Sequence, residues 1–358
     1  MTTTTPAPQA HEHDDIVYPE TVPFLLVHVA CLAALWTGVT WEAVGLGIIL
    51  YLVRMFGVTA GYHRYFSHRT FRTSRVGHFL LGWLAQSSAQ LGILWWAAKH
   101  RHHHRHSDTE LDVHSPRQHG FLYAHMGWIF TARHDATDFD AVPDLARYRE
   151  LVWLNAHPYL PAASLAALAY VLAGWPGVVV GFVWSTVALY HGTFMINSLA
   201  HVHGRVRYVT GDDSRNNWWL AVLTLGEGWH NNHHAYQRST RQGFRWWEFD
   251  PTFYALRALS WLRLVWDLGE PPPEVVRNER PLGRHTIEKV AHQLAAKYAE
   301  MHLPQLPHLP ELPSVAELRR RAEEMYAASP SMDDIAARAR ELIAQRMATL
   351  RAPEQAPA

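Results

Sequence analysis

Four long apolar runs, grouped as two closely spaced pairs, restrict the possible folds of this chain more than any other feature. The first pair covers residues 22–38 and 41–57, and the second covers residues 158–174 and 175–199. Each run is about the length that a helix needs to cross a hydrocarbon core of roughly 30 Å. The links within each pair are so short that they predict tight helical hairpins. Buried helices of a soluble core are the alternative, but this pattern favours a membrane protein.

Basic residues indicate how these runs are oriented. Both hairpin tips lack Lys and Arg, whereas the stretch between the pairs and the region after His201 contain many arginines. By the positive-inside rule, the polar regions and both termini lie in the cytoplasm. We therefore expect an all-α integral membrane protein with four transmembrane helices in two hairpins under a cytosolic helical cap. A bacterial inner membrane is the expected location.

The polar segments divide the remainder of the chain. Residues 1–20 form a polar lead without the basic start of a signal peptide, and we expect it to be disordered. Within the membrane domain, residues 21–270, the cap comprises residues 58–157 and 200–270. Residues 76–98 are apolar but contain polar interruptions, which predict one helix lying at the membrane surface or against the catalytic domain. A fifth span is the alternative.

A charged tail, residues 274–358, follows a run of three prolines. Its pattern is helical, and Ser314 begins a capping box. We consider two roles for this tail: a solvated helical appendage, or a docking site for an electron donor.

Composition excludes some classes of function. The chain has 32 Lys and Arg against 32 Asp and Glu, so its net charge gives no reason to expect a nucleic-acid partner. Its single cysteine, Cys31, can form neither an internal disulfide nor a thiolate metal site. Histidine, with 26 residues, is the unusual component, and imidazole is the commonest protein ligand for metals.

Three clusters contain the histidines whose spacing suggests metal binding. They are His63 with His68; His100 with His103 and His104; and His230 with His233 and His234. At about 100° per residue, positions 0, +3 and +4 of a helix point the same way, which explains the last two clusters. The same rotation places His102 and His106 on the opposite face. We interpret the isolated histidines as ordinary surface or core residues: His78, His114, His119, His125, His134, His157, His191 and His203.

The first cluster fits this rotation less well. His63 and His68 would lie about 140° apart on an α-helix, so they can flank one metal only if the helix ends or loosens between them. The clusters together offer eight imidazoles, about twice what one zinc ion takes, and this number predicts two metals. Iron is favoured because oxidation of an apolar chain needs redox chemistry, which zinc lacks. The alternative is that these histidines bind no metal.

Three motifs give the sequence a family resemblance. Gly57–Thr70 (GVTAGYHRYFSHRT), Asn197–His201 (NSLAH) and Gly226–His234 (GEGWHNNHH) resemble the membrane fatty acyl desaturases, specifically the bacterial type of the acyl-CoA delta-9, or stearoyl-CoA-type, branch. The resemblance implies two iron ions in the cap. It also implies that His201 is a ninth ligand and that Asn197 reaches the metal through water.

The resemblance further implies a narrow tunnel for the acyl chain beside the irons. Phe194 corresponds to a position near this tunnel, while Arg133 and Arg215 correspond to basic positions near its cytosolic mouth. Asp108 and Glu227 are candidates for orienting the imidazole ligands.

The expected reaction is the O2-dependent insertion of a cis double bond, with delta-9 as the expected position, into a saturated acyl thioester. CoA is preferred over acyl carrier protein, although Ala98 and Lys99 replace an Arg-Asp pair of the animal enzymes. No His-Pro-Gly-Gly haem motif occurs, so electrons are expected from a separate ferredoxin or cytochrome b5-like protein. A di-iron hydroxylase or other oxygenase of acyl chains or lipids is the first alternative. A metal transporter is a remote one, because few ionisable residues lie within the apolar runs.

Overall fold

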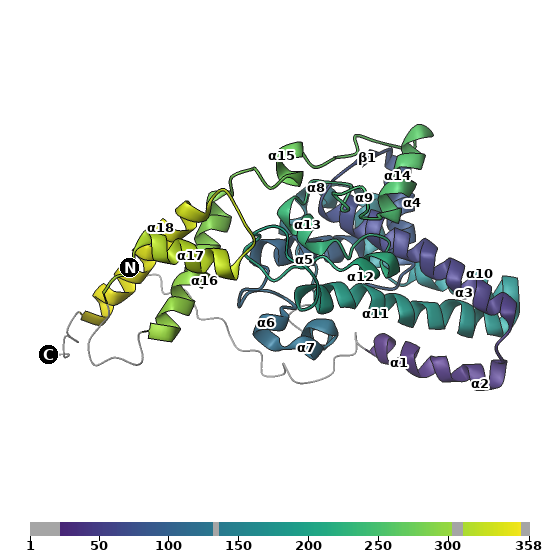
Figure 1. Cartoon of the computed structure of the whole chain (residues 1–358). Helices are drawn as coiled ribbons and strands as arrows, with labels where there is room; N and C mark the ends of the chain where they lie inside the picture. The colour runs from purple at the N-terminus through teal and green to yellow at the C-terminus, as the bar shows by residue number, and fades with distance from the viewer. Residues whose placement is uncertain (1–21, 132–135, 303–310, 352–358) are drawn as a thin grey trace, which may run out of the picture.

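The computed structural model describes residues 22–131, 136–302 and 311–351. Figure 1 shows long apolar helices at one end of the molecule, a cap of short helices and loops in the middle, and the helices of the tail at the other end. The predicted lead at residues 1–20 and the predicted site residue Arg133 lie outside the described residues.

The first apolar pair consists of α1 (Val22–Ala30) and α2 (Ala34–Thr37), followed by α3 (Trp41–Phe56). The turn before α3 passes through Gly38, whose φ of 77° suits a residue without a Cβ atom. Thr40 begins α3, because its hydroxyl accepts a hydrogen bond of 3.2 Å from the backbone N–H of Ala43.

The second apolar pair meets at a kink. Helix α10 (Leu160–Pro176) is interrupted at Gly174, where φ is 61° and ψ is -152°. A π-helix (Gly177–Trp184) and α11 (Ser185–Asn197) then follow. Figure 1 shows the kink at the end of the molecule farthest from the tail.

Two helical stretches, Trp41–Ser67 and Leu160–His201, are long and apolar enough to cross a membrane, and a shorter apolar stretch covers Val22–Thr37. Large apolar side chains such as Leu35 and Trp41 are more than three-quarters exposed at this end of the chain. Surfaces of this kind are typical of membrane-associated proteins. The division into four spans stays a prediction.

A buried arginine joins the two apolar pairs. Arg54 of α3 is fully buried, and its guanidinium donates to the hydroxyls of Ser185 at 2.5 Å and Thr186 at 2.6 Å. A buried cation without such acceptors would be costly, so these hydroxyls fix α11 against α3.

The single surface helix predicted for residues 76–98 is wrong. The structure has two helices here, α4 (Arg75–Gln86) and α5 (Ile93–His106). The side chain of Gln86 causes the break, because its amide oxygen accepts from Ile93 N–H at 3.0 Å and its amide nitrogen donates to Leu154 O at 2.9 Å. These two hydrogen bonds hold α4, α5 and the helix that contains Leu154 together.

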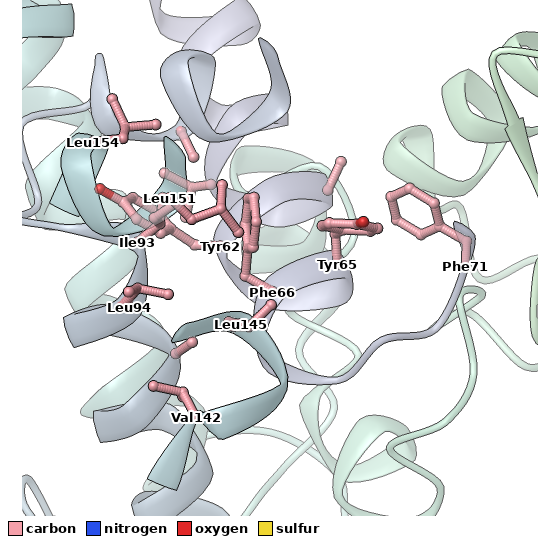
Figure 2. Close-up of a cluster of buried hydrophobic side chains, with 14 of the residues drawn as sticks. Tyr62, Tyr65, Phe66, Phe71, Ile93, Leu94, Val142, Leu145, Leu151 and Leu154 are labelled. Carbon is pink, nitrogen blue, oxygen red and sulfur yellow. The ribbon is translucent and has the colours of Figure 1, made fainter. Parts of the chain in front are cut away.

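The main apolar core lies where α5 meets the extension of α3 and α9 (Arg149–Ala156). Figure 2 shows Phe66 beside Leu145 and Leu151, with Ile93 and Leu154 nearby. All five side chains are fully buried. This core fixes the segment that carries the first histidine cluster against the helix that carries the second.

Short elements complete the cap. They are α6 (Pro116–His119), α7 (Phe121–His125), α8 (Pro143–Ala146), α12 (Trp218–Leu223), α13 (His230–Ala235), α14 (Pro251–Trp261) and α15 (Pro273–Val276). Strand β1 (Arg72–Thr73) pairs antiparallel with β2 (Val265–Trp266).

The tail forms α16 (Arg284–His302), α17 (Val315–Met325) and α18 (Met332–Arg351), which pack around an apolar core of their own. The Ser314 hydroxyl accepts from Glu317 N–H at 3.1 Å, which confirms the predicted cap. The tail is helical, as predicted.

The tail also contacts the cap at two carbonyls. The Lys289 ammonium donates to Ser107 O, just past the end of α5. The Gln293 side chain donates to Gly211 O at 2.9 Å. The tail is therefore packed against two loops of the cap, and the appendage interpretation does not describe it fully.

Candidate metal centre

A π-helix brings the first histidine pair together. The helix of α3 continues as a π-helix over Gly57–Ser67, and His68 N–H donates to His63 O at 3.2 Å. This i→i+5 hydrogen bond is the one that defines a π-turn, and it stacks residues five apart. The two rings consequently lie with their centroids 4.9 Å apart. The helix is therefore wound more loosely between His63 and His68, as their pairing at one metal requires.

The third cluster lies on α13, and the asparagines between its histidines anchor this short helix. Asn231 accepts from Tyr208 N–H at 2.8 Å and donates to Tyr208 O at 3.1 Å. Asn232 donates to Glu248 at 2.9 Å. Because both amides are fully buried and bonded, the histidines of α13 face the opposite way, toward α5.

The nine predicted histidines form two neighbouring groups. Group one consists of His63, His68, His100, His104 and His233. Group two consists of His103, His201, His230 and His234. Within each group, one ring nitrogen of every histidine lies within 4.8 Å of the others. The rings of His104 and His234 connect the groups, with centroids 4.5 Å apart.

The two helical clusters contribute to the groups in a reciprocal way. On α5, His100 and His104 join group one and His103 joins group two. On α13, the first and last join group two and His233 joins group one. Helix rotation explains this division, because residues i and i+4 are closer in angle to each other than to i+3.

The Nε2 atoms converge at separations that suit a shared metal. Nε2 of His63 lies 3.0 Å from that of His233, and Nε2 of His68 lies 2.8 Å from that of His100. In group two, the corresponding distance between His201 and His230 is 3.1 Å. Nitrogens bound side by side to one metal at roughly 2.1 Å would be separated by about 3.0–3.4 Å.

Carboxylates hold the outer nitrogens of three group-two histidines. The Nδ1 atoms of His103 and His201 lie 2.9 Å from Asp112 and Asp108, respectively. Nδ1 of His234 lies 2.9 Å from Asp212. A carboxylate accepts the Nδ1 proton and thereby leaves Nε2 free to bind a metal.

Among the residues that the structure describes, one carboxylate supports group one. Nδ1 of His63 lies 2.5 Å from Glu227, which also pairs with the buried Arg64 at 3.1 Å. Gln242 donates at 3.0 Å to Oε2 of Glu227, the oxygen that contacts His63. The sequence analysis named Asp108 and Glu227 as orienting groups, and each contacts the Nδ1 atom of a histidine.

Three supporting residues were missed. Asp112, Asp212 and Gln242 belong to no histidine cluster, and they lie in loops of the cap. The four-residue spacing of Asp108 and Asp112, directly after α5, was the one usable signal. Asp212 reaches His234 only through tertiary packing, so periodicity could not have found it.

Burial favours the neutral form that a metal ligand needs, and it lowers the pKa of six of these imidazoles: His68, His100, His104, His230, His233 and His234. His201 differs, because burial alone would lower its pKa but the Asp108 carboxylate outweighs it and raises that pKa to about 9. Burial and then the adjacent His63 hold the pKa of His100 well below its usual value. Burial and then His234 do the same for the pKa of His104. For Asp112, burial alone would raise the pKa, but the neighbouring His103 outweighs it and lowers that pKa, so the carboxylate stays ionised.

The donor set fits bound metal ions. Nδ1 of His104, His230 and His233 and Nε2 of His234 are buried ring nitrogens without a hydrogen-bond partner. Nε2 of His234 is the atom that the Asp212 contact at Nδ1 leaves free, and a metal bound there would satisfy it. Histidine-rich, thiolate-free sites of this type suit Fe, Zn, Cu or Ni.

An apolar cavity of about 130 Å³ reaches group one. His100 and His114 lie on its wall together with Phe24, Phe194 and Asn197. Aromatic side chains form much of the remaining wall: Trp95, Trp96, Trp128, Tyr159 and Tyr190. The structure thus brings Phe194 and Asn197 together beside the histidines, as the resemblance implied.

Other predicted residues lie elsewhere. Arg215 does not line this cavity, and its backbone N–H donates to Ala200 O at 2.7 Å. His102 and His106 belong to neither group, and His102 contacts Leu111 O at 2.8 Å. His114 was interpreted as isolated, but its ring nitrogen forms a further cluster with ligand atoms of His103 and Asp112, all within 4.8 Å of one another.

The sequence of this chain matches the family model described as "Fatty acid desaturase" over residues 39–263, which contain all nine histidines. The chain belongs to the fatty acid desaturase family. It is therefore an oxidoreductase of lipid metabolism, and its histidine groups are consistent with the di-iron centres of this membrane-bound family.

Named desaturases are similar over most of their length. An acyl-CoA 5-desaturase of Anemone leveillei is 37% identical over 68% of this chain and 77% of its own. An sn-2 palmitoyl-lipid 9-desaturase of Nostoc sp. is 35% identical over 75% of this chain and 95% of its own. An sn-1 stearoyl-lipid 9-desaturase of Synechocystis sp. is 36% identical over 72% of this chain and 81% of its own. Desaturases of acyl-CoA and of acyl lipids are thus both similar to this chain.

Proposed function

We propose that this chain is a delta-9 desaturase that inserts a cis double bond into a saturated acyl chain with two iron ions, O2 and two externally supplied electrons. The observation that carries the proposal is the convergence of nine imidazoles in two groups, one of which reaches the wall of an apolar cavity through His100. Iron bound there would supply the oxidising power that removal of hydrogen from unactivated methylene groups requires.

The residues of the chain have distinct roles in this proposal. Groups one and two would each hold one iron through their ring nitrogens, and Asn197 would reach the metal through a water molecule. Glu227 and the three aspartates keep the ligand tautomers fixed. Phe194 and its aromatic neighbours exclude water and align the methylene groups beside group one.

The proposed membrane arrangement follows the sequence analysis. Four spans in two hairpins carry the cap on the cytoplasmic side of a bacterial inner membrane, and both termini are cytoplasmic. Residues 21–270 form the membrane domain and residues 274–358 the tail. The kink at Gly174 supports a reversal between the last two spans.

The proposed substrate is an acyl thioester, with CoA favoured over acyl carrier protein. The similarity to an acyl-CoA desaturase supports this carrier. The similarity to two acyl-lipid desaturases makes an intact lipid the alternative carrier.

A fatty-acid profile of expressing cells tests the proposal. Fatty acid methyl esters from cells expressing the chain, His103→Ala or His102→Ala would be compared by gas chromatography–mass spectrometry. We expect a new monounsaturated acid with the wild type and with His102→Ala, whose ring lies outside both groups, and none with His103→Ala. Hydroxylated acids would instead identify an oxygenase. Profiles that do not respond to His103→Ala would refute the proposal.

A further inference from the structure

Two polar clefts reach the histidine groups by routes separate from the apolar cavity. One cleft, of about 490 Å³, has His234 of group two on its wall. The other, of about 360 Å³, has His68 and His104 of group one on its wall. Neither cleft shares a lining residue with the apolar cavity. The metal centre is thus accessible from two sides of different chemical character.

The two clefts are neighbours on one face of the cap. Gln237 and Arg238 line both of them and form their common wall. The far wall of the first cleft includes Arg280 and residues 281–283 of the tail. Arg101 and Arg105 line the second.

This face is cationic. Four arginines line the clefts, and no Asp or Glu appears among the described residues of either lining. Asp144 neutralises Arg101 through contacts of 2.6 and 3.0 Å. In contrast, Arg105, Arg238 and Arg280 are exposed, and no described carboxylate lies within ion-pair distance of them. Three uncompensated positive charges therefore surround the openings.

The proposed reaction requires a reductant that reaches this centre. Desaturation takes two electrons and two protons from the acyl chain, whereas reduction of one O2 to two waters takes four of each. Two electrons and two protons must therefore come from outside in every turnover. With an acyl chain in the apolar cavity, the two polar clefts offer a separate approach to the imidazoles.

We propose that Arg105, Arg238 and Arg280 form a docking surface for an acidic one-electron carrier protein. This inference rests on the proposed function and names its redox partner site. The electrons enter through His234 on one side and through His68 or His104 on the other. Complementary charge accelerates encounter of such partners and makes their association sensitive to salt.

The same surface gives the tail a role. Arg280 belongs to the segment between α15 and α16, so the tail contributes one of the three charges and one wall of a cleft. Residues of the cap supply the other two charges. The docking surface is therefore complete only when the tail is packed against the cap.

A matched pair of triple variants tests the inference. The first is Arg105→Gln/Arg238→Gln/Arg280→Gln. The control is Arg149→Gln/Arg320→Gln/Arg346→Gln, which removes the same charge from exposed arginines that line neither cleft. Turnover of the purified full chain is measured with a reduced acidic ferredoxin, with a reduced soluble cytochrome b5, and with a small viologen reductant.

We expect the KM for the protein donor to rise roughly tenfold in the first variant alone, with a weaker dependence of rate on salt. Turnover driven by viologen should be equal in all three proteins. An unchanged donor KM, or a change in the KM for the acyl substrate instead, would overturn the docking surface. Failure of both protein donors where viologen succeeds would also overturn it. Absence of turnover with viologen in the wild type would count against the proposed function itself.

Discussion

The support of His234 by Asp212 allows one prediction to be worked out from the structure. Oδ2 of Asp212 accepts from His234, while Oδ1 accepts from Thr210 Oγ1 at 2.7 Å and from Ser214 N–H at 3.1 Å. In Asp212→Asn, the amide oxygen must take the position of Oδ1, because three donors point at it when the Ser214 hydroxyl is included. The amide NH2 group then faces His234 and can only donate.

This donation reverses the tautomer of the ring. Nδ1 of His234 becomes an acceptor, and the ring proton moves to Nε2, the atom that would bind the metal. Loss of such an outer hydrogen bond typically costs 10–100-fold in metal affinity. A tenfold change corresponds to about 1.4 kcal/mol, so we expect a loss of about 1.4–2.8 kcal/mol. Group one should be spared, because Asp212 contacts none of its histidines.

The assay is iron retention by the purified protein during dialysis against graded concentrations of a chelator. We expect Asp212→Asn to lose one of its two irons at a chelator strength about tenfold below that needed for the wild type. Asp213→Asn is the matched control, because that neighbouring carboxylate pairs with Arg117 instead. Wild-type retention of both irons by Asp212→Asn would refute the tautomer argument.

Three further predictions concern stability and the tail. Leu154→Ala should destabilise the fold by about 2–5 kcal/mol in denaturant titrations, because this leucine is fully buried in the main core. Glu150→Gln should make the free energy of unfolding depend less on pH between 4.5 and about 2. Hydrogen bonds from Arg75 lower the pKa of Glu150 from 4.5 to about 2, so the stabilisation by this carboxylate is present above pH 4.5 and is lost as the pH falls toward 2. Lys289→Ala/Gln293→Ala should weaken iron retention at group two, since these side chains hold the loops that carry its aspartates.

Each of these predictions has a matched control. Leu111→Ala removes an exposed leucine and should leave stability within about 0.5 kcal/mol of the wild type. Glu110→Gln removes an exposed carboxylate and should leave the pH dependence of the free energy of unfolding as in the wild type. Lys297→Ala removes an exposed lysine of α16 and should retain iron normally. A control that behaved like its test variant would contradict the structural reason given for that prediction.

The sequence predicted the chemistry of the site better than its division into two groups. Rotation on an α-helix identified His100, His103 and His104 correctly as one inward-facing set. It could not show that His103 serves a different group, because that depends on where α13 lies. For His63 and His68 the same rotation required the helix to end or loosen between them, but it could not show that a π-helix does so.

Long-range contacts account for the other differences. Gln86 divides the predicted surface helix through hydrogen bonds to residues of two other helices, and these partners are separate in sequence. The carboxylates of group two come from loops without periodicity. His201 was found only through the family resemblance, since an isolated histidine carries no spacing signal. Local patterns therefore identify ligands on helices, whereas tertiary packing selects their supports.

The reciprocal arrangement of α5 and α13 links the geometry of the two metal groups to the packing of the cap. Each helix contributes to both groups, so a shift of one helix along the other would separate ligands of both metals at once. The apolar core fixes α5, the buried asparagines fix α13, and the tail holds the loop after α5 and the loop at Gly211. The two long apolar helical stretches supply His63 and His201, but the spacing of the two groups depends on the rest of the cap and on the tail. Variants of the tail should therefore change metal retention without any contact with a ligand.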